Sequence, residues 1–328
     1  WELYKYSLPL KNPLRMLGLT LKVRKGIVLR LYDQTGNFGE GEISPMPLMH
    51  VESLSQAETQ LKKFLKKSFQ QNPDLFKSLP PSVRFGFEMA WRTLFKKFDL
   101  DEKIPSRSDV IFESERAEHN TVLKHIPVNA LVTGSGDELR HQCEQIKFDG
   151  FKAVKIKVGQ LKVHEDLKRL EIAKKIFGNQ ITLRVDANRG WEFKQATDFA
   201  MGVRDLNIEY CEEPLRNIKL LKKLHEHSGM QVALDETLWS NPDPIELPNS
   251  SIRALILKPG ILGGWGNTRF WINHAKKYKM LAVISSSMES GIGLNWIAYT
   301  DLCLLNKRTP AGLDSAKFFQ NDLADPPF

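Results

Sequence analysis

The chain has 328 residues, of which 41% are hydrophobic and 26% are charged. This composition excludes a collagen, an intrinsically disordered chain and a small protein held together by disulfides. The formal charge of +8, from 47 basic and 39 acidic residues, is spread along the chain and favours a small anionic substrate. The densest basic cluster, LKKFLKK at 61–67, is typical of the solvated face of an amphipathic helix, so we expect no nucleic-acid partner.

Cysteine usage and the N-terminal segment predict the compartment. The three cysteines are odd in number and lack CxxC spacing, which favours a reducing environment. Glu2 and Lys5 interrupt the place where a signal peptide would be apolar, and no apolar run approaches the roughly 18 residues of a membrane-spanning helix. We therefore predict a cytoplasmic protein that does not bind membranes. The sequence predicts no particular oligomeric state.

Residues 1–120 are expected to form an α+β domain of their own. Alternating apolar positions predict paired strands at 19–33 and 38–44, joined by the turn QTGN. Apolar residues at helical spacing predict helices at 51–69 and 82–98, and a polar linker follows at 100–120.

From residue 126 onward, short β-branched runs alternate with amphipathic stretches of about 12 to 16 residues, which is typical of a parallel sheet with crossover helices. The strand candidates are 126–132, 153–158, 181–186, 207–212, 231–235, 253–258 and 281–285, with a short eighth at 311–314, and the clearest helices are 163–177, 192–205 and 267–278. These strands suffice for a closed α/β barrel over 121–314, with a doubly wound open sheet as the alternative.

Charged residues end five consecutive strand candidates: Lys157, Asp186, Glu212, Asp235 and Lys258. Their spacings of 29, 26, 23 and 23 residues each match the length of one βα unit. Strands of a parallel sheet are buried on both faces, so these charges are costly unless they meet partners or a metal. We predict that they gather at the C-terminal mouth of the barrel.

Strand side chains alternate with period two, so Lys155 shares the face of Lys157 while Ile156 points to the helices. By the same rule Glu213 points away from Glu212, and the two do not form a catalytic pair.

Three carboxylates without histidine or cysteine form a hard oxygen site, which predicts Mg²⁺; the same ligands also accept Mn²⁺. A divalent ion flanked by lysines on opposite strands suits proton abstraction beside a carboxylate, in which the metal holds the developing enediolate and a neutral lysine takes the proton. Burial and a neighbouring cation such as Lys155 are expected to lower the pKa of that lysine.

At this point the chain resembles the enolase superfamily, and most closely its o-succinylbenzoate synthases. The matching motifs occur in the family's order over nearly the whole chain. They are FGEGEISPMP (38–47), KIKVG (155–159), LRVDANRGW (183–191), CEEPL (211–215), LDETL (234–238), LKPGILGG (257–264) and SSSMESGIGL (285–294).

The resemblance implies a modified TIM barrel of (β/α)7β type under an N-terminal capping domain, with the tail 315–328 packing back on the cap and loops near 12–24 and 45–51 closing over the substrate. It implies catalytic roles for Lys157 as general base and for Lys258 as a cation on the opposite side. The remaining implied roles are metal binding by Asp186, Glu212 and Asp235, substrate binding by Lys155, Asn188, Ser285 and Ser287, and orientation by Arg184, Glu213 and Glu236.

The implied reaction is a lyase reaction of menaquinone biosynthesis, the dehydration of 2-succinyl-6-hydroxy-2,4-cyclohexadiene-1-carboxylate to o-succinylbenzoate. Lys157 would remove the proton next to the ring carboxylate and then protonate the departing hydroxyl on the same face.

Other functions stay open. Lysines on opposite faces also suit an N-succinylamino acid racemase or another lysine-based racemase or epimerase, although the loop SSSMESG at 285–291 lacks the DxD associated with dipeptide epimerases. A non-catalytic barrel is disfavoured by the intact lysines and carboxylates. A retaining glycosidase using Glu212 would act without Mg²⁺.

Overall fold

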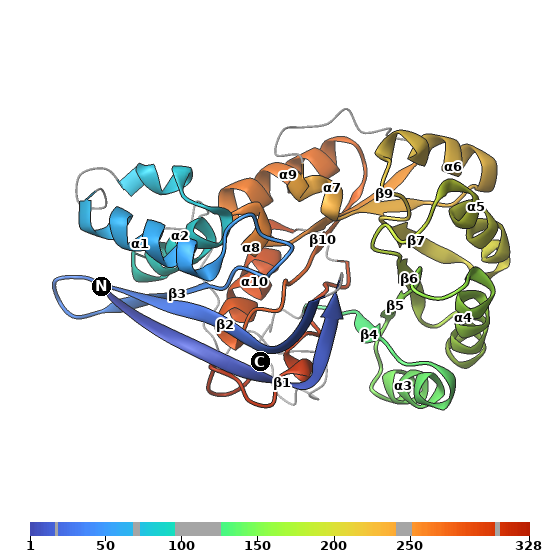
Figure 1. The fold of residues 1–328 in the computed structure, drawn as a ribbon, viewed down its shortest axis with the longest axis horizontal. Helices are drawn as coiled ribbons and strands as arrows, with labels where there is room; N and C mark the ends of the chain where they lie inside the picture. The colour runs from blue at the N-terminus through green and yellow to red at the C-terminus, as the bar shows by residue number, and fades with distance from the viewer. Residues whose placement is uncertain (17–18, 68–72, 96–125, 241–250, 306–308) are drawn as a thin grey trace, which may run out of the picture.

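The computed structural model describes the chain except for residues 17–18, 68–72, 96–125, 241–250 and 306–308. Figure 1 shows an N-terminal antiparallel sheet with its helices beside a curled parallel sheet that is surrounded by helices. The predicted linker at 100–120, and with it the predicted domain boundary, lies outside the described residues.

The N-terminal part is a three-stranded antiparallel sheet in the order β1-β2-β3, covered by helices. Apolar residues alternate at the end of the central strand, where Ile27, Leu29 and Leu31 are buried against the helices. The elements are β1 (Glu2–Met16), β2 (Leu19–Tyr32), β3 (Phe38–Ile43), α1 (Leu54–Lys67), the 3₁₀ helix η1 (Pro73–Ser78) and α2 (Pro81–Phe95).

One part of this region differs from the expectation. The segment 12–24 was expected to be a loop over the substrate, but its described residues mostly belong to the paired strands β1 and β2, with Leu14 opposite Leu21. The long strand β1 was not anticipated because its prolines and lysines break the alternation of apolar residues. Its pairing with β2 explains why it is extended, since β2 supplies the hydrogen-bonding partners.

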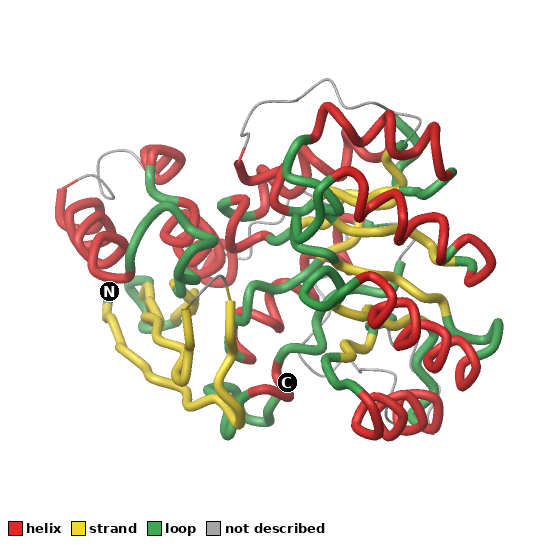
Figure 2. The backbone as a smooth tube through the Cα atoms, turned by 45° about the vertical axis from the view of Figure 1, so that its right-hand side comes forward, coloured by secondary structure: helices red, strands yellow, loops and turns green. Residues whose placement is uncertain are grey.

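The rest of the chain confirms the predicted parallel β/α barrel. Seven parallel strands follow one another in sequence order, with helices outside them (Figure 2). The strands are β4 (Ala130–Val132), β5 (Ala153–Lys157), β6 (Thr182–Asp186), β7 (Ile208–Glu212), β8 (Val232–Leu234), β9 (Ile252–Leu257) and β10 (Leu281–Ile284).

After each strand of the barrel, the next α-helix begins two to nine residues later. They are α3 (Gly136–Phe148), α4 (Val163–Phe177), α5 (Phe193–Gly202), α6 (Leu221–Ser228), α7 (Glu236–Ser240), α8 (Pro259–Leu262), α9 (Trp265–Lys277) and α10 (Gly291–Leu304), with 3₁₀ turns η3 (Arg204–Leu206), η4 (Ile218–Leu220) and η5 (Ala316–Phe318). Within the described ranges, none of the helices is long and apolar enough to cross a membrane.

A short eighth segment joins the two edges of the seven-stranded sheet. Ala311 forms a parallel bridge with Val128 just before β4, and Gly312 forms one with Ser285 just after β10. The backbone amide of Asn129 donates to the Ala311 carbonyl at 2.9 Å. The sheet is therefore the expected (β/α)7β form, and the alternative of a doubly wound open sheet is wrong.

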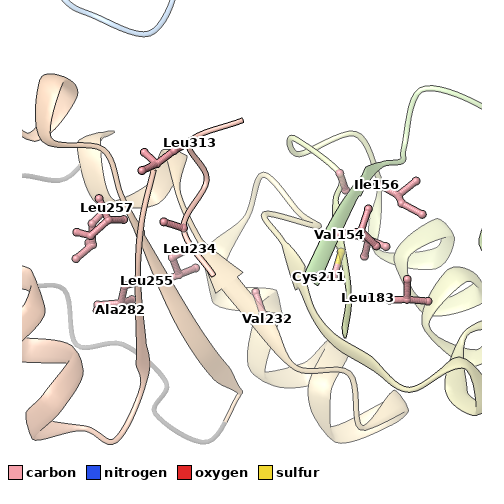
Figure 3. Close-up of a cluster of buried hydrophobic side chains, with 14 of the residues drawn as sticks. Val154, Ile156, Leu183, Cys211, Val232, Leu234, Leu255, Leu257, Ala282 and Leu313 are labelled. Atoms are coloured by element: carbon pink, nitrogen blue, oxygen red, sulfur yellow. The ribbon is translucent and has the colours of Figure 1, made fainter. Parts of the chain in front are cut away.

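The period-two alternation of the strands separates an outer core from the barrel interior. Val154, Ile156, Leu234 and Leu257 belong to the large core between the strands and the helices (Figure 3). A second, smaller cluster is formed by inward side chains, namely Tyr210, Ala233, Ala254, Ile256 and Val283. The residues next to the outward set, Lys155 and Lys157 among them, consequently face the interior of the barrel.

Buried polar contacts attach the N-terminal sheet to the barrel. Glu42 of β3 is buried and accepts hydrogen bonds from the amides of Ser290 (3.0 Å) and Gly293 (2.9 Å), so it caps the N-terminus of α10. Arg24 of β2 donates to the Met288 carbonyl at 3.0 Å. The C-terminal segment also contacts this sheet, because the amide of Gln320 donates to the Pro9 carbonyl at 3.0 Å.

The packing of β3 on α2 generates a stability prediction. A Cβ atom on Gly41 would lie 1.7 Å from the Gly86 carbonyl oxygen, so the two backbones are in contact. We expect Gly41→Ala to lower the free energy of unfolding by about 3 kcal/mol, measured by urea denaturation. Gly266→Ala is the matched control, because nothing lies within 4 Å of that Cβ in α9, and it should be neutral or stabilise by up to about 1 kcal/mol. Equal stabilities of the two variants would contradict the close contact.

Candidate active site

The predicted charged residues lie side by side at one end of the barrel. Lys157, Asp186 and Glu212 are the last residues of β5, β6 and β7, and strand register places Lys157 opposite Asp186 and Asp186 opposite Glu212. Asp235 follows β8 directly, and Lys258 follows β9 directly. The C-terminal ends of parallel barrel strands meet at one mouth, so five neighbouring strands contribute to a single site.

Lysines pair with all three buried carboxylates. Lys157 Nζ lies 2.7 Å from Asp186 Oδ2, and Lys155 Nζ lies 3.1 Å from Glu212 Oε2 and 3.4 Å from Asp186 Oδ2. Lys258 is in direct contact with Asp235 Oδ2. Because the carboxylate side chains are almost completely buried, the lysines supply charge that water cannot.

The three lysines differ in exposure. The side chain of Lys157 is 33% exposed, against 14% for Lys155 and 10% for Lys258. Of these three side chains, that of Lys157 is thus the most exposed.

The charges of the site shift each other's pKa values. Burial raises the pKa of Glu212 well above its usual range, and the charges of Asp186 and Asp235 add to this effect. Burial also opposes ionisation of Asp186, but the ammonium groups of Lys157 and Lys155 outweigh it and hold the pKa of Asp186 below its usual range.

The two less exposed lysines are held in the charged form. Burial alone would lower the pKa of Lys155, but the carboxylates of Glu212 and Asp186 raise it above its ordinary value. Asp235 and Glu212 likewise overcome the effect of burial and raise the pKa of Lys258. Both are therefore cations in the folded protein, which agrees with the positive charge expected of Lys155 beside Lys157 and of Lys258 on the opposite side.

Asn188 connects Lys157 with the loop after β8. Its Oδ1 accepts from Lys157 Nζ at 2.6 Å, and its Nδ2 donates to Glu236 Oε1 at 3.0 Å. The backbone of Asn188 has φ 42°, in the left-handed region that asparagine tolerates, and its amide donates to Asp186 Oδ1 at 3.1 Å. This turn places an amide oxygen beside the amine of Lys157.

Glu213 supports the turn that carries Asp235. It is buried, and its Oε1 accepts from the amides of Asp235 (2.9 Å) and Thr237 (2.6 Å). Its Oε2 accepts from Arg189 Nε at 3.0 Å. Glu213 thus points away from Glu212 and orients Asp235 through the backbone.

Arg184 does not reach the site, contrary to the expectation. Its guanidinium donates to Glu209 Oε2 (2.7 Å), Asn129 Oδ1 (3.0 Å) and the Pro310 carbonyl (2.7 Å), and it lies 5.2 Å from the centre of the Tyr210 ring. These partners lie toward the N-terminal ends of the strands. Alternation gives the correct face for Arg184, but its place two residues before Asp186 puts it deeper in the barrel.

The serines of the last motif are not on one strand face, because β10 ends at Ile284. Ser285 Oγ donates to the Gly312 carbonyl at 3.3 Å. The amide of Ser287 donates to Glu289 Oε2 at 2.6 Å, and its hydroxyl contacts the same carboxylate. Sequence reasoning missed Glu289, which is buried and whose pKa is raised chiefly by burial. The sequence feature that could have identified Glu289 is its charge inside the SSSMES motif, two residues after Ser287.

The carboxylates of the site are candidate ligands for a divalent cation. Within the described ranges, no three His, Cys, Asp or Glu side chains converge closely enough to hold an ion; each site carboxylate is bound to a lysine instead. The donor set still suits Mg²⁺, because Asp186, Glu212 and Asp235 offer only hard oxygen ligands. The raised pKa of Glu212 also shows that the lysines do not fully stabilise its charge.

The site predicts how stability depends on pH. Burial and the charges of Asp235 and Asp186 raise the pKa of Glu236 from 4.5 to about 7. Between these values the folded protein holds a proton that the unfolded chain has released, so this contribution to stability is complete below pH 4.5 and is lost as the pH rises through 7. We expect the free energy of unfolding of the metal-free protein to fall between pH 5 and pH 8.

The variant Glu236→Gln should reduce that fall by roughly 1 to 3 kcal/mol, measured by urea unfolding in the presence of a chelator. Glu226→Gln, at an exposed site of α6, is the control and should keep the wild-type slope. Identical slopes for Glu236→Gln and wild type would contradict the raised pKa.

Known proteins resemble this chain both in its N-terminal part and in its barrel. Residues 138–328 match the family model described as enolase C-terminal domain-like, and residues 1–94 match that of the MenC N-terminal domain. The o-succinylbenzoate synthase of Pectobacterium atrosepticum is 27% identical over 324 residues, which cover 98% of this chain and 91% of that protein. Protein PHYLLO of Arabidopsis thaliana is 30% identical over 305 residues, 83% of this chain but only 17% of that much longer protein.

Solved structures share the fold. An o-succinylbenzoate synthase from Thermosynechococcus elongatus, complexed with Mg in its active site, has a TM-score of 0.74 at 22% identity and covers 98% of this chain and 94% of that one. The L-Ala-D/L-Glu epimerase of Bacillus subtilis has a TM-score of 0.76 at 20% identity and covers 98% and 91%. With its barrel matched by the family model and its charged residues at the mouth of that barrel, the chain belongs to the enolase superfamily of enzymes.

Proposed function

We propose that this enzyme is an o-succinylbenzoate synthase, a lyase of menaquinone biosynthesis. It would convert 2-succinyl-6-hydroxy-2,4-cyclohexadiene-1-carboxylate into o-succinylbenzoate and water. The observation that carries the proposal is the difference among the site lysines: Lys157 is one-third exposed, whereas Lys155 and Lys258 are largely buried. One accessible amine suits an elimination in which a single group handles both proton transfers. The MenC match at residues 1–94 and the full-length relatives support the same reaction.

The contacts of Lys157 orient its amine. Two of the three hydrogen-bonding positions of its amine point to acceptors, Asp186 Oδ2 at 2.7 Å and Asn188 Oδ1 at 2.6 Å. A neutral amine can keep both of these hydrogen bonds, which leaves its lone pair in the third position. Because the side chain of Lys157 is 33% exposed, the substrate would reach its amine from solvent.

The proposed reaction then needs only one acid–base residue, which lies on one face of the substrate ring. Lys157 Nζ takes the proton next to the ring carboxylate, and the resulting ammonium returns a proton to the departing hydroxyl, so that water leaves and the ring becomes aromatic. Mg²⁺ held by Asp186, Glu212 and Asp235 would supply positive charge to the substrate carboxylate. Lys258, kept charged by Asp235, adds a second positive charge on the β9 side.

We assign the remaining predicted residues to substrate contacts. Lys155 is a fixed cation between Glu212 and Asp186, and with Asn188 it would bind the ring carboxylate. Ser285 and Ser287, in the segment after β10, would contact the succinyl group. The substrate is thus a small dianion, in keeping with the net charge of +8. A cytoplasmic location stays a prediction.

A second candidate is racemisation or epimerisation, including that of N-succinylamino acids. It is favoured by the presence of two site lysines, Lys157 after β5 and Lys258 after β9, on strands that are not neighbours in the sheet. A two-base reaction requires both amines to reach the substrate. Lys258 is only 10% exposed and is bound to Asp235, which favours the one-base reaction.

The metal assignment is tested by thermal unfolding. We expect Mg²⁺ at about 100 times its Kd to stabilise the wild type by about 2.7 kcal/mol relative to protein in excess chelator, and chelation to abolish turnover. Asp235→Asn should lose most of the Mg²⁺-induced rise in Tm. The matched control Asp198→Asn, on the exposed surface of α5, should retain it. An unchanged Mg²⁺ response in Asp235→Asn would remove Asp235 from the metal site, and full turnover in chelator would favour a metal-independent reaction.

The catalytic assignment is tested by ultraviolet-monitored turnover. Lys157→Ala should lower kcat for dehydration by about 10⁴-fold because both proton transfers are lost. Lys258→Ala should lower it by only about 10²-fold through loss of positive charge. Lys194→Ala, at an exposed position of α5, is the control. Appreciable dehydration by folded Lys157→Ala would overturn its role, and racemisation without dehydration in the wild type would favour the second candidate.

A further inference from the structure

Behind the end of β5 lies a buried ion pair that the proposed reaction does not use. Asp166 and Arg169 stand one turn apart near the start of α4, with Arg169 Nη1 2.9 Å from Asp166 Oδ1. Asp166 is fully buried and Arg169 is 8% exposed. Burying such a pair in place of apolar side chains is costly or at best neutral for stability. The pair therefore calls for an explanation other than the stability of the helix.

The pair holds the backbone around Lys157. Arg169 Nη1 also donates to the Lys157 carbonyl at 2.7 Å, and Arg169 Nη2 donates to the Gly134 carbonyl at 3.1 Å. On the other side, Asp166 Oδ2 accepts from the Gly159 amide at 2.8 Å. The carbonyl of Lys157 and the amide two residues later are thus bound to the same ion pair.

The guanidinium stands where β4 no longer provides partners for β5. The pairing of β4 with β5 ends at Val132 opposite Ile156, one residue before Lys157. Arg169 bridges the two chains just past this point, through the carbonyls of Lys157 and Gly134. It thereby extends the connection between β4 and β5 to the residue whose side chain enters the site.

The backbone from Lys157 to Gly159 is packed against the turn that carries Asn188. Gly159 has φ 82°, and a Cβ there would lie 3.0 Å from the Ala187 carbonyl oxygen. A Cβ on Gly190 would lie 2.6 Å from the Gly159 carbonyl oxygen. Since these two turns are in contact, a displacement of one changes the distance between Lys157 and its partner Asn188.

We propose that Asp166 and Arg169 are positioning residues that hold the Lys157 backbone, and so keep Nζ in contact with both Asp186 and Asn188. The inference rests on the proposed role of Lys157 as the base. Asp166 and Arg169 contact Lys157 and Gly159 through backbone atoms, so the role is one of positioning. The expected effect is large because a misplacement of about 1 Å can lower a rate by about 10²-fold.

The test compares Arg169→Met and Arg169→Lys with wild type, using kcat per folded molecule, KM, and the primary isotope effect with substrate deuterated next to the ring carboxylate. For Arg169→Met we expect kcat to fall by about 30- to 100-fold while KM changes less than about twofold, with an isotope effect at least as large as that of wild type. Arg169→Lys keeps one donor for the Lys157 carbonyl and should recover part of the loss. A kcat that falls only in proportion to the folded fraction would overturn the proposal.

Arg184→Met is the matched control, because it removes another buried arginine that binds a backbone carbonyl, at the other end of the barrel. It should lower the free energy of unfolding but leave kcat per folded molecule and the isotope effect unchanged. An equal loss of kcat in Arg184→Met and Arg169→Met would show a general effect of buried arginines and overturn the proposal. If Arg169→Met does not fold, Arg169→Lys carries the comparison.

A structural measurement separates this inference from the proposed function. If the wild type fails to dehydrate the substrate, the proposed function fails, and crystal structures of wild type and Arg169→Lys then test the positioning role alone. Loss of the contact of Lys157 Nζ with Asp186 or Asn188 in the variant would support it. Retention of both contacts in the wild-type geometry would overturn it.

Discussion

The structure depends on one electrostatic constraint: charges buried at the mouth of the barrel must neutralise each other. Three almost completely buried carboxylates meet three lysines there, and five adjacent strands supply them. Water contributes little to solvation at this depth, so the pairs hold each other's ionisation states. The neutralisation of charge is incomplete at Glu212, whose pKa is raised by burial and by the carboxylates beside it. A divalent cation among these oxygens would complete the compensation, which links the stability of the site to the chemistry we propose.

The N-terminal sheet and helices support the same mouth from outside. His50 Nδ1 accepts from the Met46 amide at 2.9 Å, so its Nε2 carries the hydrogen that faces the Gly260 carbonyl at 3.2 Å, two residues past Lys258. Arg84 of α2 donates to the Leu262 carbonyl at 3.1 Å. Together with the contacts of Arg24 and Glu42 after β10, these bonds attach the N-terminal elements to the backbone that follows the last two strands.

Sequence reasoning located most of the site because two periodicities act together. Period two distinguishes Lys155 and Lys157 from Ile156, and the recurrence of one charge per βα unit places Asp186, Glu212 and Asp235 at the same end of the barrel. Periodicity does not show how deep in the barrel a strand residue lies. Arg184 was therefore assigned to the site, although it lies deeper in the barrel than the site. Nor does periodicity identify buried charges outside strands.

Charged residues on helices are ordinarily exposed, so nothing in the sequence distinguishes Asp166 and Arg169 from the solvated face of α4. They are buried because they bind the backbone of Lys157 and Gly159 just past the point where the pairing of β4 with β5 ends. The long strand β1 escaped recognition for a similar reason. Its partner β2 determines its conformation, and its own prolines obscure the pattern. Tertiary contacts thus supply the information that local patterns lack.

Our proposal of a lyase rather than a racemase depends on the difference in exposure between the two flanking lysines. Racemisation needs bases on both faces of the substrate, whereas a one-base elimination needs the second amine only as a positive charge. Asp235 holds Lys258 in the charged form, and Trp239 donates to the other oxygen of that carboxylate at 3.2 Å. Lys157 is also paired with a carboxylate, Asp186, but its side chain is 33% exposed against 10% for Lys258. The difference in exposure, rather than the identity of the two side chains, is what favours elimination in our proposal.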